Sequence, residues 1–302
     1  MTLNTMRVLR LLGACGAAMV SAQAMAQAPT SMDVDKLPTA ITVNAVVRDF
    51  RGASQTGGHP DFEVYSGSAA RVGLVNATLA ADGKPVLAST SGKLITTEWK
   101  DAAGRPIYPV LTGIRPGDTA GAFAASTPKN ITSADSFASW FNDVPGVNMS
   151  ANIPLRMVRT PGTNRYVIDS ASHAPWVNLG GFFPINGALY GNFSSWGKNF
   201  HFTTEIEATF MYDADAANIF SFSGDDDLWV YVDGKLVMDL GGLHPRKDQT
   251  LDLSRLPWLE DGKSYTLKVF HAERRTSQSN FRMETTLNLV AVDAPTAAAL
   301  HD

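Results

Sequence analysis

Residues 220–244 of this 302-residue chain read F-S-F-S-G-D-D-D-L-W-V-Y-V-D-G-K-L-V-M-D-L-G-G-L-H. The dipeptide Asp233-Gly234 separates two apolar runs, 228–232 and 235–238. A two-residue Asp-Gly connection is the strongest short-range signal for a β-hairpin, because both turn residues need a positive φ angle. The stretch therefore predicts two antiparallel strands joined by a tight turn.

Short apolar runs of the same kind recur on both sides of this hairpin. We expect further strands at 41–47, 94–99, 205–212, 219–222, 265–271 and 281–292. Within 202–212 the apolar residues share one face, and Glu205 and Glu207 share the other. One short helix is expected over 133–142, with Ser133 as its N-cap. Many short strands with turn residues between them predict an all-β fold, a two-sheet antiparallel β-sandwich with long loop insertions.

The first 26 residues have the pattern of a secretory signal peptide. Arg7 and Arg10 precede an apolar run over 11–20, and small residues then alternate up to Ala28, which fits cleavage after Ala26. The run is too short to span a bilayer, which needs roughly 20 apolar residues, so no membrane insertion is expected. We expect a protein exported in the bacterial manner, and either secreted or held at the cell surface.

Cys15 leaves a second processing route open. The residues 12–15, Leu-Gly-Ala-Cys, look like a lipoprotein processing site, although the preceding apolar stretch is shorter than the usual length of about seven or more residues. Cys15 is the only cysteine, so a chain cleaved after Ala26 would contain no disulfide. After the signal we expect a linker over 27–40, one domain over 41–292 and a tail over 293–302.

The charge of the chain argues against a nucleic-acid partner. The 25 Lys and Arg residues are outnumbered by 29 Asp and Glu residues, and loss of Arg7 and Arg10 with the signal takes the formal charge from −4 to −6. A phosphate backbone is bound by a basic stripe or patch. We therefore expect no nucleic acid among the partners.

Three consecutive acids, Asp225, Asp226 and Asp227, precede the hairpin. Adjacent carboxylates repel one another unless a cation lies among them. Clustered oxygen ligands suit calcium, which takes about six to eight of them; a solvated acidic turn at a strand edge is the alternative. The spacing is not that of an EF-hand, because counting from Asp213 places no glycine sixth and Gly224 twelfth.

The residues around the acids resemble the signature of the fibro-slime domain family, a branch of the protective-antigen-type (PA-fourteen) β-sandwich domains. The resemblance covers G-D-D-D-L-W-V-Y-V-D-G-K at 224–235 and D-L-G-G-L-H at 239–244. Further segments agree at 59–63, 140–148, 182–187, 199–205, 270–275 and 279–282. In this order they span roughly residues 43–290.

The resemblance implies a two-sheet, jelly-roll-like sandwich with a calcium site. In sugar-binding members of the wider superfamily, an Asp-Asp pair joined by a cis peptide holds a calcium ion that binds sugar hydroxyls. The matching pair here is Asp225-Asp226. Asp227 stands where many members have glycine, so it is either a third ligand or a residue that crowds the sugar position. Asn280, in the second ligand-binding loop over 277–280, is a further candidate ligand.

Two other residues near the acids are candidates for contact with a ligand. Trp229 offers an aromatic face on which a sugar can stack, and His244 follows the hairpin. The alternative for each is structural, as a core residue for Trp229 and as a turn residue for His244. His59 and Asp61 are expected to anchor a loop, and a contribution to a polar site is the alternative. For the run over 271–274, which holds a His, a Glu and an Arg, an internal ion pair is the alternative to ligand contact.

The expected function is that of a secreted or surface-associated, calcium-dependent carbohydrate-binding protein in adhesion or extracellular matrix, whose partner is an extracellular glycan or polysaccharide. The alternative is a non-catalytic structural matrix protein whose ion only stabilises the fold. We expect no enzyme. Nothing in the sequence singles out a pair of carboxylates for glycoside hydrolysis, and no G-x-S-x-G motif marks a nucleophile.

Overall fold

The computed structural model describes residues 34–291. The expected signal peptide, Cys15, residues 27–33 of the expected linker and the tail over 293–302 lie outside this range. The strands are β1 (Ala40–Phe50), β2 (Arg71–Val72), β3 (Lys93–Thr97), β4 (Trp99–Lys100), β5 (Pro106–Ile107), β6 (Ala122–Ala125), β7 (Asn148–Arg159), β8 (Tyr166–Asp169), β9 (Phe202–Met211), β10 (Ile219–Gly224), β11 (Asp227–Val232), β12 (Lys235–Leu240), β13 (Lys247–Asp252), β14 (Ser264–Glu273), β15 (Phe281–Thr285) and β16 (Val290–Ala291). The helices are all short: α1 (Pro109–Thr112), α2 (Ala134–Ala138), α3 (Trp176–Leu179) and the 3-10 turns η1 (Val34–Lys36) and η2 (Leu253–Arg255). Within 34–291, no helix has the length and apolar character needed to cross a membrane.

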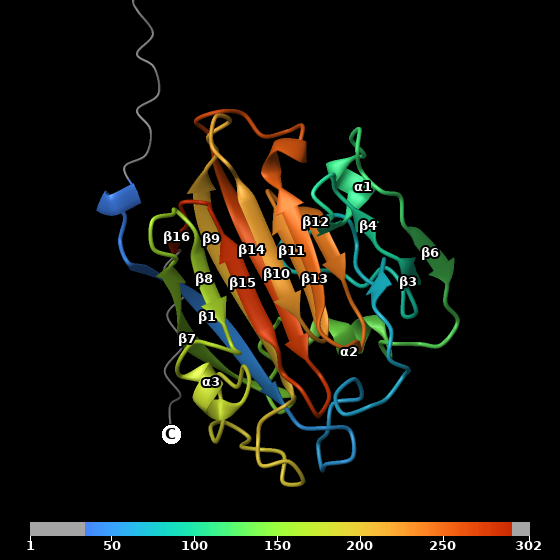
Figure 1. The fold of residues 1–302 in the computed structure, drawn as a ribbon. Coiled ribbons are helices and arrows are strands. Elements are labelled where there is room, and N and C mark those ends of the chain that lie inside the picture. Colours follow the sequence, from blue (N-terminus) through green and yellow to red (C-terminus); the bar gives the residue numbers. More distant parts are fainter. Residues whose placement is uncertain (1–33, 292–302) are drawn as a thin grey trace, which may run out of the picture. The chain divides into compact units, whose positions relative to one another are not determined.

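Eleven of these strands form one antiparallel sheet that folds back over an apolar core (Figure 1). The strand order is β12-β11-β14-β9-β1-β7-β8-β15-β10-β13, and β16 pairs with β9. The two ends of this path approach each other, because the backbone N–H of Asp239 in β12 donates to the Gln249 side chain in β13 at 2.9 Å. The expected all-β antiparallel sandwich is confirmed, with its two layers joined in one hydrogen-bonded path.

The predicted hairpin, β11 and β12 joined by Asp233-Gly234, is confirmed. Asp233 has a φ of 52° and Gly234 a φ of 72°, as a turn of this type requires. The flanking strands pair directly across it, with Val232 opposite Lys235.

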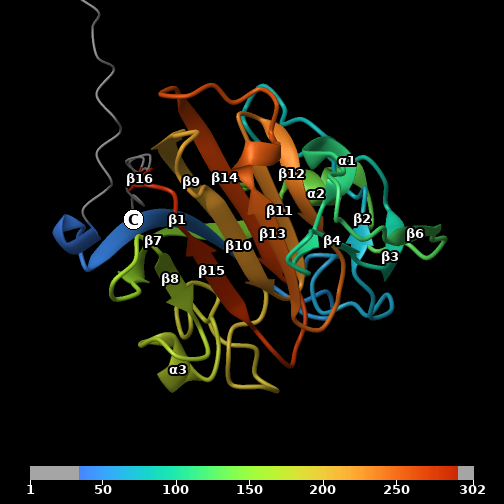
Figure 2. The ribbon, with the colours of Figure 1, turned by 45° about the horizontal axis from the view of Figure 1, so that its top comes forward.

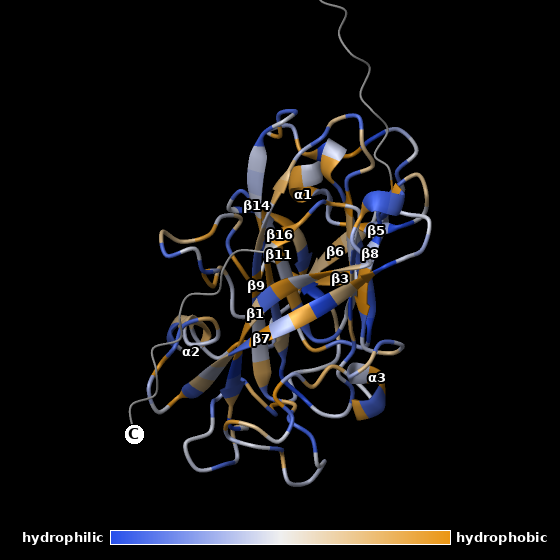
Figure 3. Cartoon of the chain, turned by 90° about the vertical axis from the view of Figure 1, so that its left-hand side faces the viewer, coloured by the Kyte–Doolittle hydropathy of each residue, from blue (hydrophilic) through white to orange (hydrophobic). Residues whose placement is uncertain are grey.

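The expected alternation within 202–212 is confirmed as well. Phe202, Ile206 and Phe210 of β9 point into the core, and the same alternation continues in its neighbour β1 through Val43, Ala45 and Val47. Figure 3 shows β1 and β7 lying side by side, with hydrophobic and hydrophilic residues interleaved along both. One strand face therefore packs inward while the opposite face carries the polar residues.

Three elements differ from the sequence expectation. Ser133 does cap α2, accepting a hydrogen bond from the Ser136 backbone N–H at 3.0 Å, but the helix ends at Ala138 rather than at residue 142. It ends there because the Asn148 amide bonds the carbonyls of Ser139 and Asn142 and so holds the chain in a turn. The run over 281–292 is divided into β15 and β16, and the run over 94–99 into β3 and β4.

Residues 51–147, between β1 and β7, form an insertion that covers the outer face of the hairpin (Figure 2). It contains two small sheets, β2-β3-β6 and β4-β5, together with α1 and α2. A second apolar cluster lies beneath it and includes Phe137 and Trp140 of the insertion. In β11, Leu228, Val230 and Val232 belong to the first core, whereas Trp229 and Tyr231 belong to the second. Both faces of β11 are therefore buried.

Candidate functional site

The first two acids of the acidic run lie in the loop between β10 and β11, next to the loop between β14 and β15. The strands that lead into these loops are paired: Gly224 of β10 lies opposite Phe281 of β15, and Asp227 of β11 lies opposite Ala272 of β14. Both loops connect the two layers of the sandwich at the same end. The pairing therefore brings residues 225–226 beside residues 274–280, although about fifty positions separate them in the sequence.

Gly224 allows the two loops to approach closely. A Cβ at this position would lie 2.5 Å from the backbone oxygen of Asn280 and 2.6 Å from the ring of Phe222. Neither neighbour is the free end of a flexible side chain, so a larger residue would push the loops apart. The glycine before the acidic run thus has a packing role as well as a place in the motif.

Asp225 joins the two loops through hydrogen bonds. Its Oδ1 accepts from the backbone N–H of Asn280 at 2.6 Å, and its Oδ2 accepts from the Asn280 side-chain amide at 2.7 Å. The Asp225 carbonyl accepts a third bond, from Nε2 of the buried His271, at 2.8 Å. Asn280 is therefore at the predicted place, beside the first acid, but it faces that acid with its amide nitrogen.

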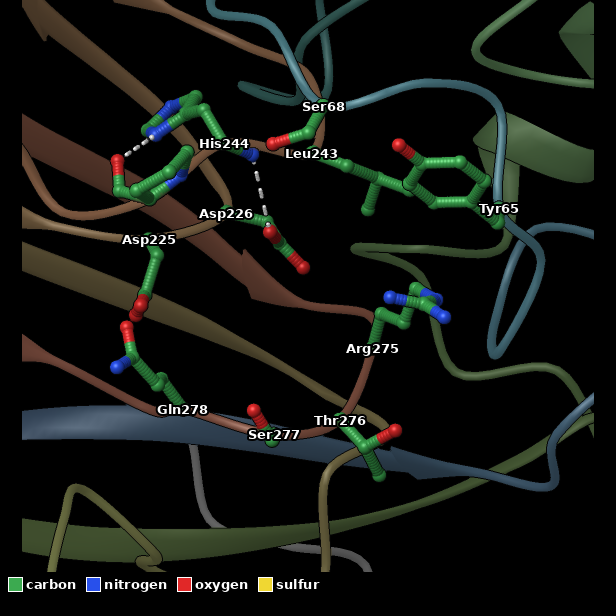
Figure 4. Close-up of a pocket in the computed structure, with 11 residues that line it drawn as sticks. Tyr65, Ser68, Asp225, Asp226, Leu243, His244, Arg275, Thr276, Ser277 and Gln278 are labelled. Atoms are coloured by element: carbon green, nitrogen blue, oxygen red, sulfur yellow. Dashed lines mark hydrogen bonds between the residues drawn. The ribbon is translucent and has the colours of Figure 1, made fainter.

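Asp226 turns its carboxylate into an open pocket of about 190 Å³ (Figure 4). The peptide bond between Asp225 and Asp226 is cis, as the resemblance implied, and so is the bond between Thr276 and Ser277 across the pocket. The Asp226 carboxylate accepts from the backbone N–H groups of His244, at 3.3 Å, and Arg274, at 3.2 Å. The pocket is lined by Tyr65, Ser68, Asp225, Asp226, Leu243, His244, Pro245, Arg275, Thr276, Ser277 and Gln278.

Asp227 points away from this pocket into the protein, where it is 0% exposed. Its Oδ2 forms an ion pair with Nε of Arg274 at 2.6 Å, and its Oδ1 accepts from the Gly242 backbone N–H at 2.6 Å. Arg274 donates further to the carbonyl and the side chain of Asn130, at 3.0 and 2.6 Å. Of the two readings that the sequence left open, this geometry gives Asp227 neither a ligand position nor a place at the sugar. It is a buried partner of Arg274.

The carboxylates near the pocket are held at elevated pKa. Burial raises the pKa of Asp225, and burial together with the neighbouring charges of Asp227 and Asp225 raises that of Asp226, against the lowering effect of Arg274. Glu273 lies behind the pocket, 0% exposed, and its Oε2 has no hydrogen-bond partner. Burial, and then the nearness of Asp226 and Asp225, raises the pKa of Glu273 well above its ordinary value.

These residues suit a hard cation in their donor chemistry. Asp225 and Asp226 present carboxylate oxygens and form no ion pair with any residue in the described part of the chain. The unpartnered oxygen of Glu273 marks an excess of acceptors over donors behind them. Oxygen-only donor sets favour calcium over zinc or copper. Within 34–291, however, no three His, Cys, Asp or Glu side chains converge on one point, so neutral oxygens would have to complete the coordination.

Trp229 and His244, the two further candidates for ligand contact, lie in different places. Trp229 is 0% exposed in the second core, where its indole N–H donates to Asp239 at 3.1 Å. It is not at the pocket, so the expectation that it contacts a ligand is wrong; the insertion covers the strand face that would otherwise be open. His244 does line the pocket, but both its ring nitrogens lie near backbone carbonyls, those of Pro245 and Leu240, which fix the turn.

Several lining residues have no counterpart among the sequence candidates. Tyr65 and Ser68 come from the insertion, more than 150 positions before the acids, and no motif marked them. Arg275 follows the conspicuous run over 271–274, and Gln278 lies in the loop that was singled out for Asn280. His59 and Asp61 lie in the insertion as loop anchors: His59 bonds Ser139 and Asp61 bonds Trp140.

This sandwich, with an acidic loop at its end, has the architecture of a PA14 domain. The model of that family, described as the PA14 domain, matches residues 188–298, a range that contains β9 to β16 and the whole acidic run. The resemblance to PA14-type domains that was inferred from the sequence is thereby confirmed for residues 188–298.

Among known proteins the chain is similar to psi proteins of Dictyostelium discoideum. It is 31% identical to Protein psiF over 245 residues, which cover 76% of this chain and 30% of that protein. It is 34% identical to Protein psiC over 174 residues, which cover 54% of this chain and 31% of that protein. The chain thus spans about a third of the length of these relatives. It also aligns with the PA14 domain of the MpAFP antifreeze protein at 11% identity and a TM-score of 0.22, covering 33% of this chain and 48% of that one.

Proposed function

We propose that this protein is a non-catalytic, calcium-dependent carbohydrate-binding protein that acts outside the cell or at its surface, in adhesion or extracellular matrix. Asp225 and Asp226 would hold the ion, with Asn280 as a further ligand if its amide presents oxygen in place of nitrogen. The glycan would occupy the open pocket beside them. Asp227 and Trp229 have no part in this proposal, because both are committed to the interior.

The observation that carries the proposal is the common position of two carboxylates. Asp225 and Asp226 are consecutive residues, yet both line one open pocket, and neither carboxylate has a basic partner among the described residues. A bound divalent cation would neutralise both charges and offer its remaining coordination positions to hydroxyl groups. The polar side chains of Ser68, Ser277 and Gln278 around the same opening are suited to hydrogen bonds with a sugar. The PA14 family match over these residues supports the same assignment.

The proposal is tested by calcium titration calorimetry on the purified protein and on a variant carrying Asp225→Ala and Asp226→Ala. Stoichiometric binding by the wild type and none by the variant is the expected result. A glycan array probed with calcium, and again with chelator, then asks whether sugar binding follows the ion. No calcium binding by the folded wild-type protein would overturn the proposal.

A second candidate is a structural matrix protein in which the ion only stabilises the fold. The specific observation in its favour is that Asp225 is already bonded to Asn280 at both carboxylate oxygens and so ties two loops together. An ion there would strengthen a link between the sandwich layers. Calcium that raises the melting temperature without enabling binding to any glycan would favour this alternative.

A further inference from the structure

We propose that the sugar bound at this pocket carries an anionic group, a carboxylate or a sulfate, and that Arg275 binds that group. The inference rests on the proposed function and narrows its ligand class. It comes from Arg275, the one Lys or Arg among the pocket-lining residues, on the side opposite the Asp225–Asp226 loop.

Arg275 is held at the edge of the pocket with its guanidinium facing the opening. Figure 4 shows it on the side of the cavity opposite Asp225, between Tyr65 and Thr276. Its guanidinium carbon lies 4.8 Å from the centre of the Tyr65 ring. This stacking limits the positions of the side chain without using its hydrogen-bond donors.

Those donors have no partner within the described residues. Arg275 forms no ion pair there, and the hydrogen bond that it does make, to Glu273, comes from its backbone N–H. Its neighbour Arg274 is the opposite case, since its guanidinium is bonded to Asp227 and twice to Asn130. Arg275 therefore has a planar set of donors available for a ligand, a geometry that matches carboxylate and sulfate oxygens.

The charge around the pocket makes this preference depend on the ion. The permanently charged or acidic side chains among the lining residues are Asp225, Asp226 and Arg275. Without a cation, the Asp225 and Asp226 carboxylates, when ionised, offset the charge of Arg275 and repel an anionic sugar. A divalent cation neutralises the carboxylates, and the charge of Arg275 then remains to attract one. An anionic sugar would thus bind only to the calcium-loaded protein, whereas a neutral sugar would lack the contact with Arg275.

The experiment compares two matched pairs of trisaccharides on the full protein. In the first pair the terminal residue is glucuronate or glucose, and in the second it is 6-sulfated or unsulfated galactose. Affinities are measured with calcium and with chelator for the wild type, Arg275→Gln, Arg275→Lys and the control Arg246→Gln. Arg246 is a suitable control because it is exposed, lies outside the pocket and bonds only Ser223 among the described residues.

We expect at least one anionic sugar to bind the calcium-loaded wild type about tenfold or more tightly than its neutral partner, the range of a charge-assisted hydrogen bond. Arg275→Gln should abolish the difference and leave the neutral sugars unaffected, Arg275→Lys should retain part of it, and Arg246→Gln should retain all of it. Equal binding of both members of each pair, or a preference that survives Arg275→Gln, overturns this inference alone. Absence of binding by all four sugars in calcium also overturns this inference, whereas absence of calcium binding by the same folded protein overturns the proposed function with it.

Discussion

Asp226 and Asp227 are adjacent in the chain, yet they lie in opposite environments. Asp226 belongs to the open site, which we define as Asp225 and Asp226 at the pocket, and has no basic side chain paired with it in the described residues. Asp227 belongs to the closed pair, which we define as Asp227 and Arg274, and is fully buried. The closed pair has its counter-charge within the fold. The carboxylates of the open site have no such counter-charge among the described residues, so they are the ones available to a cation.

The contrast follows from the position of each residue in the backbone. Asp227 is the first residue of β11 and points into the interior between the hairpin and the insertion, where Arg274 meets it. The two preceding residues lie outside any strand, so the alternation of strand side chains does not apply to them.

Breaking the closed pair should have the largest effect on stability. Arg274→Ala would leave Asp227 charged and buried without its partner, and such changes cost about 3–5 kcal/mol. The free energy of unfolding from urea denaturation measures this loss. Arg246→Ala, at an exposed arginine that bonds only a serine hydroxyl among the described residues, is the control and should change stability by less than about 0.5 kcal/mol. Equal losses in the two variants would contradict the assignment of a buried pair.

The open site should respond to calcium instead. An ion that binds only the folded state, and is present at a free concentration of about 100 times its dissociation constant, adds about 2.7 kcal/mol to the free energy of unfolding. We expect this gain in the wild type, its reversal by chelator, and no gain in a variant carrying Asp225→Asn and Asp226→Asn. If the double variant gained as much as the wild type, the ion would have to bind elsewhere.

Gly224→Ala tests whether the close approach of the two loops matters to the open site. The added Cβ would lie 2.5 Å from the Asn280 backbone oxygen, and overpacking of this kind costs about 1–3 kcal/mol. Because the loops would separate at Asp225, calcium affinity should fall as well, as calorimetry would measure. An unchanged affinity in a destabilised variant would mean that the ion does not need both loops.

A second buried ion pair, Asp118 with Arg255, should affect only the acid limb of the stability curve. Hydrogen bonds from Arg255 lower the pKa of Asp118 to about 2, against an ordinary value of about 3.9. An acid with a lowered folded-state pKa stabilises the fold above its unfolded pKa and loses that contribution as the pH falls towards its folded pKa. Stability should therefore fall between about pH 4 and pH 2, and Asp118→Asn should flatten this slope. Denaturation midpoints across this range, with Asp213→Asn as a surface control, would measure it.

The sequence predicted the sandwich and its hairpin well, because alternation along β9 and the Asp-Gly turn are local signals. It offered a core position for Trp229 only as an alternative to ligand contact, since the burial of this side chain depends on an insertion whose strands are mostly too short to show a period. It could not connect Tyr65 with residues more than 150 positions later. The sequence already set Asp227 apart, because many family members have glycine there, but it left the role of Asp227 open. Its place at the start of β11 and its bond to Arg274 decide that role. Binding of an ion by Asp225, Asp226 and Asn280 stays a prediction.

The burial of β11 between two cores has a consequence for how the protein folds. The aromatic cluster beneath the insertion joins Phe137 and Trp140 to Trp229 and Phe270, about ninety or more positions further along the chain. During synthesis the first two side chains emerge well before the last two. Contacts this far apart in sequence slow folding and leave apolar surface exposed meanwhile. The insertion therefore cannot bury its side of this cluster until the chain has been made as far as Phe270 in β14.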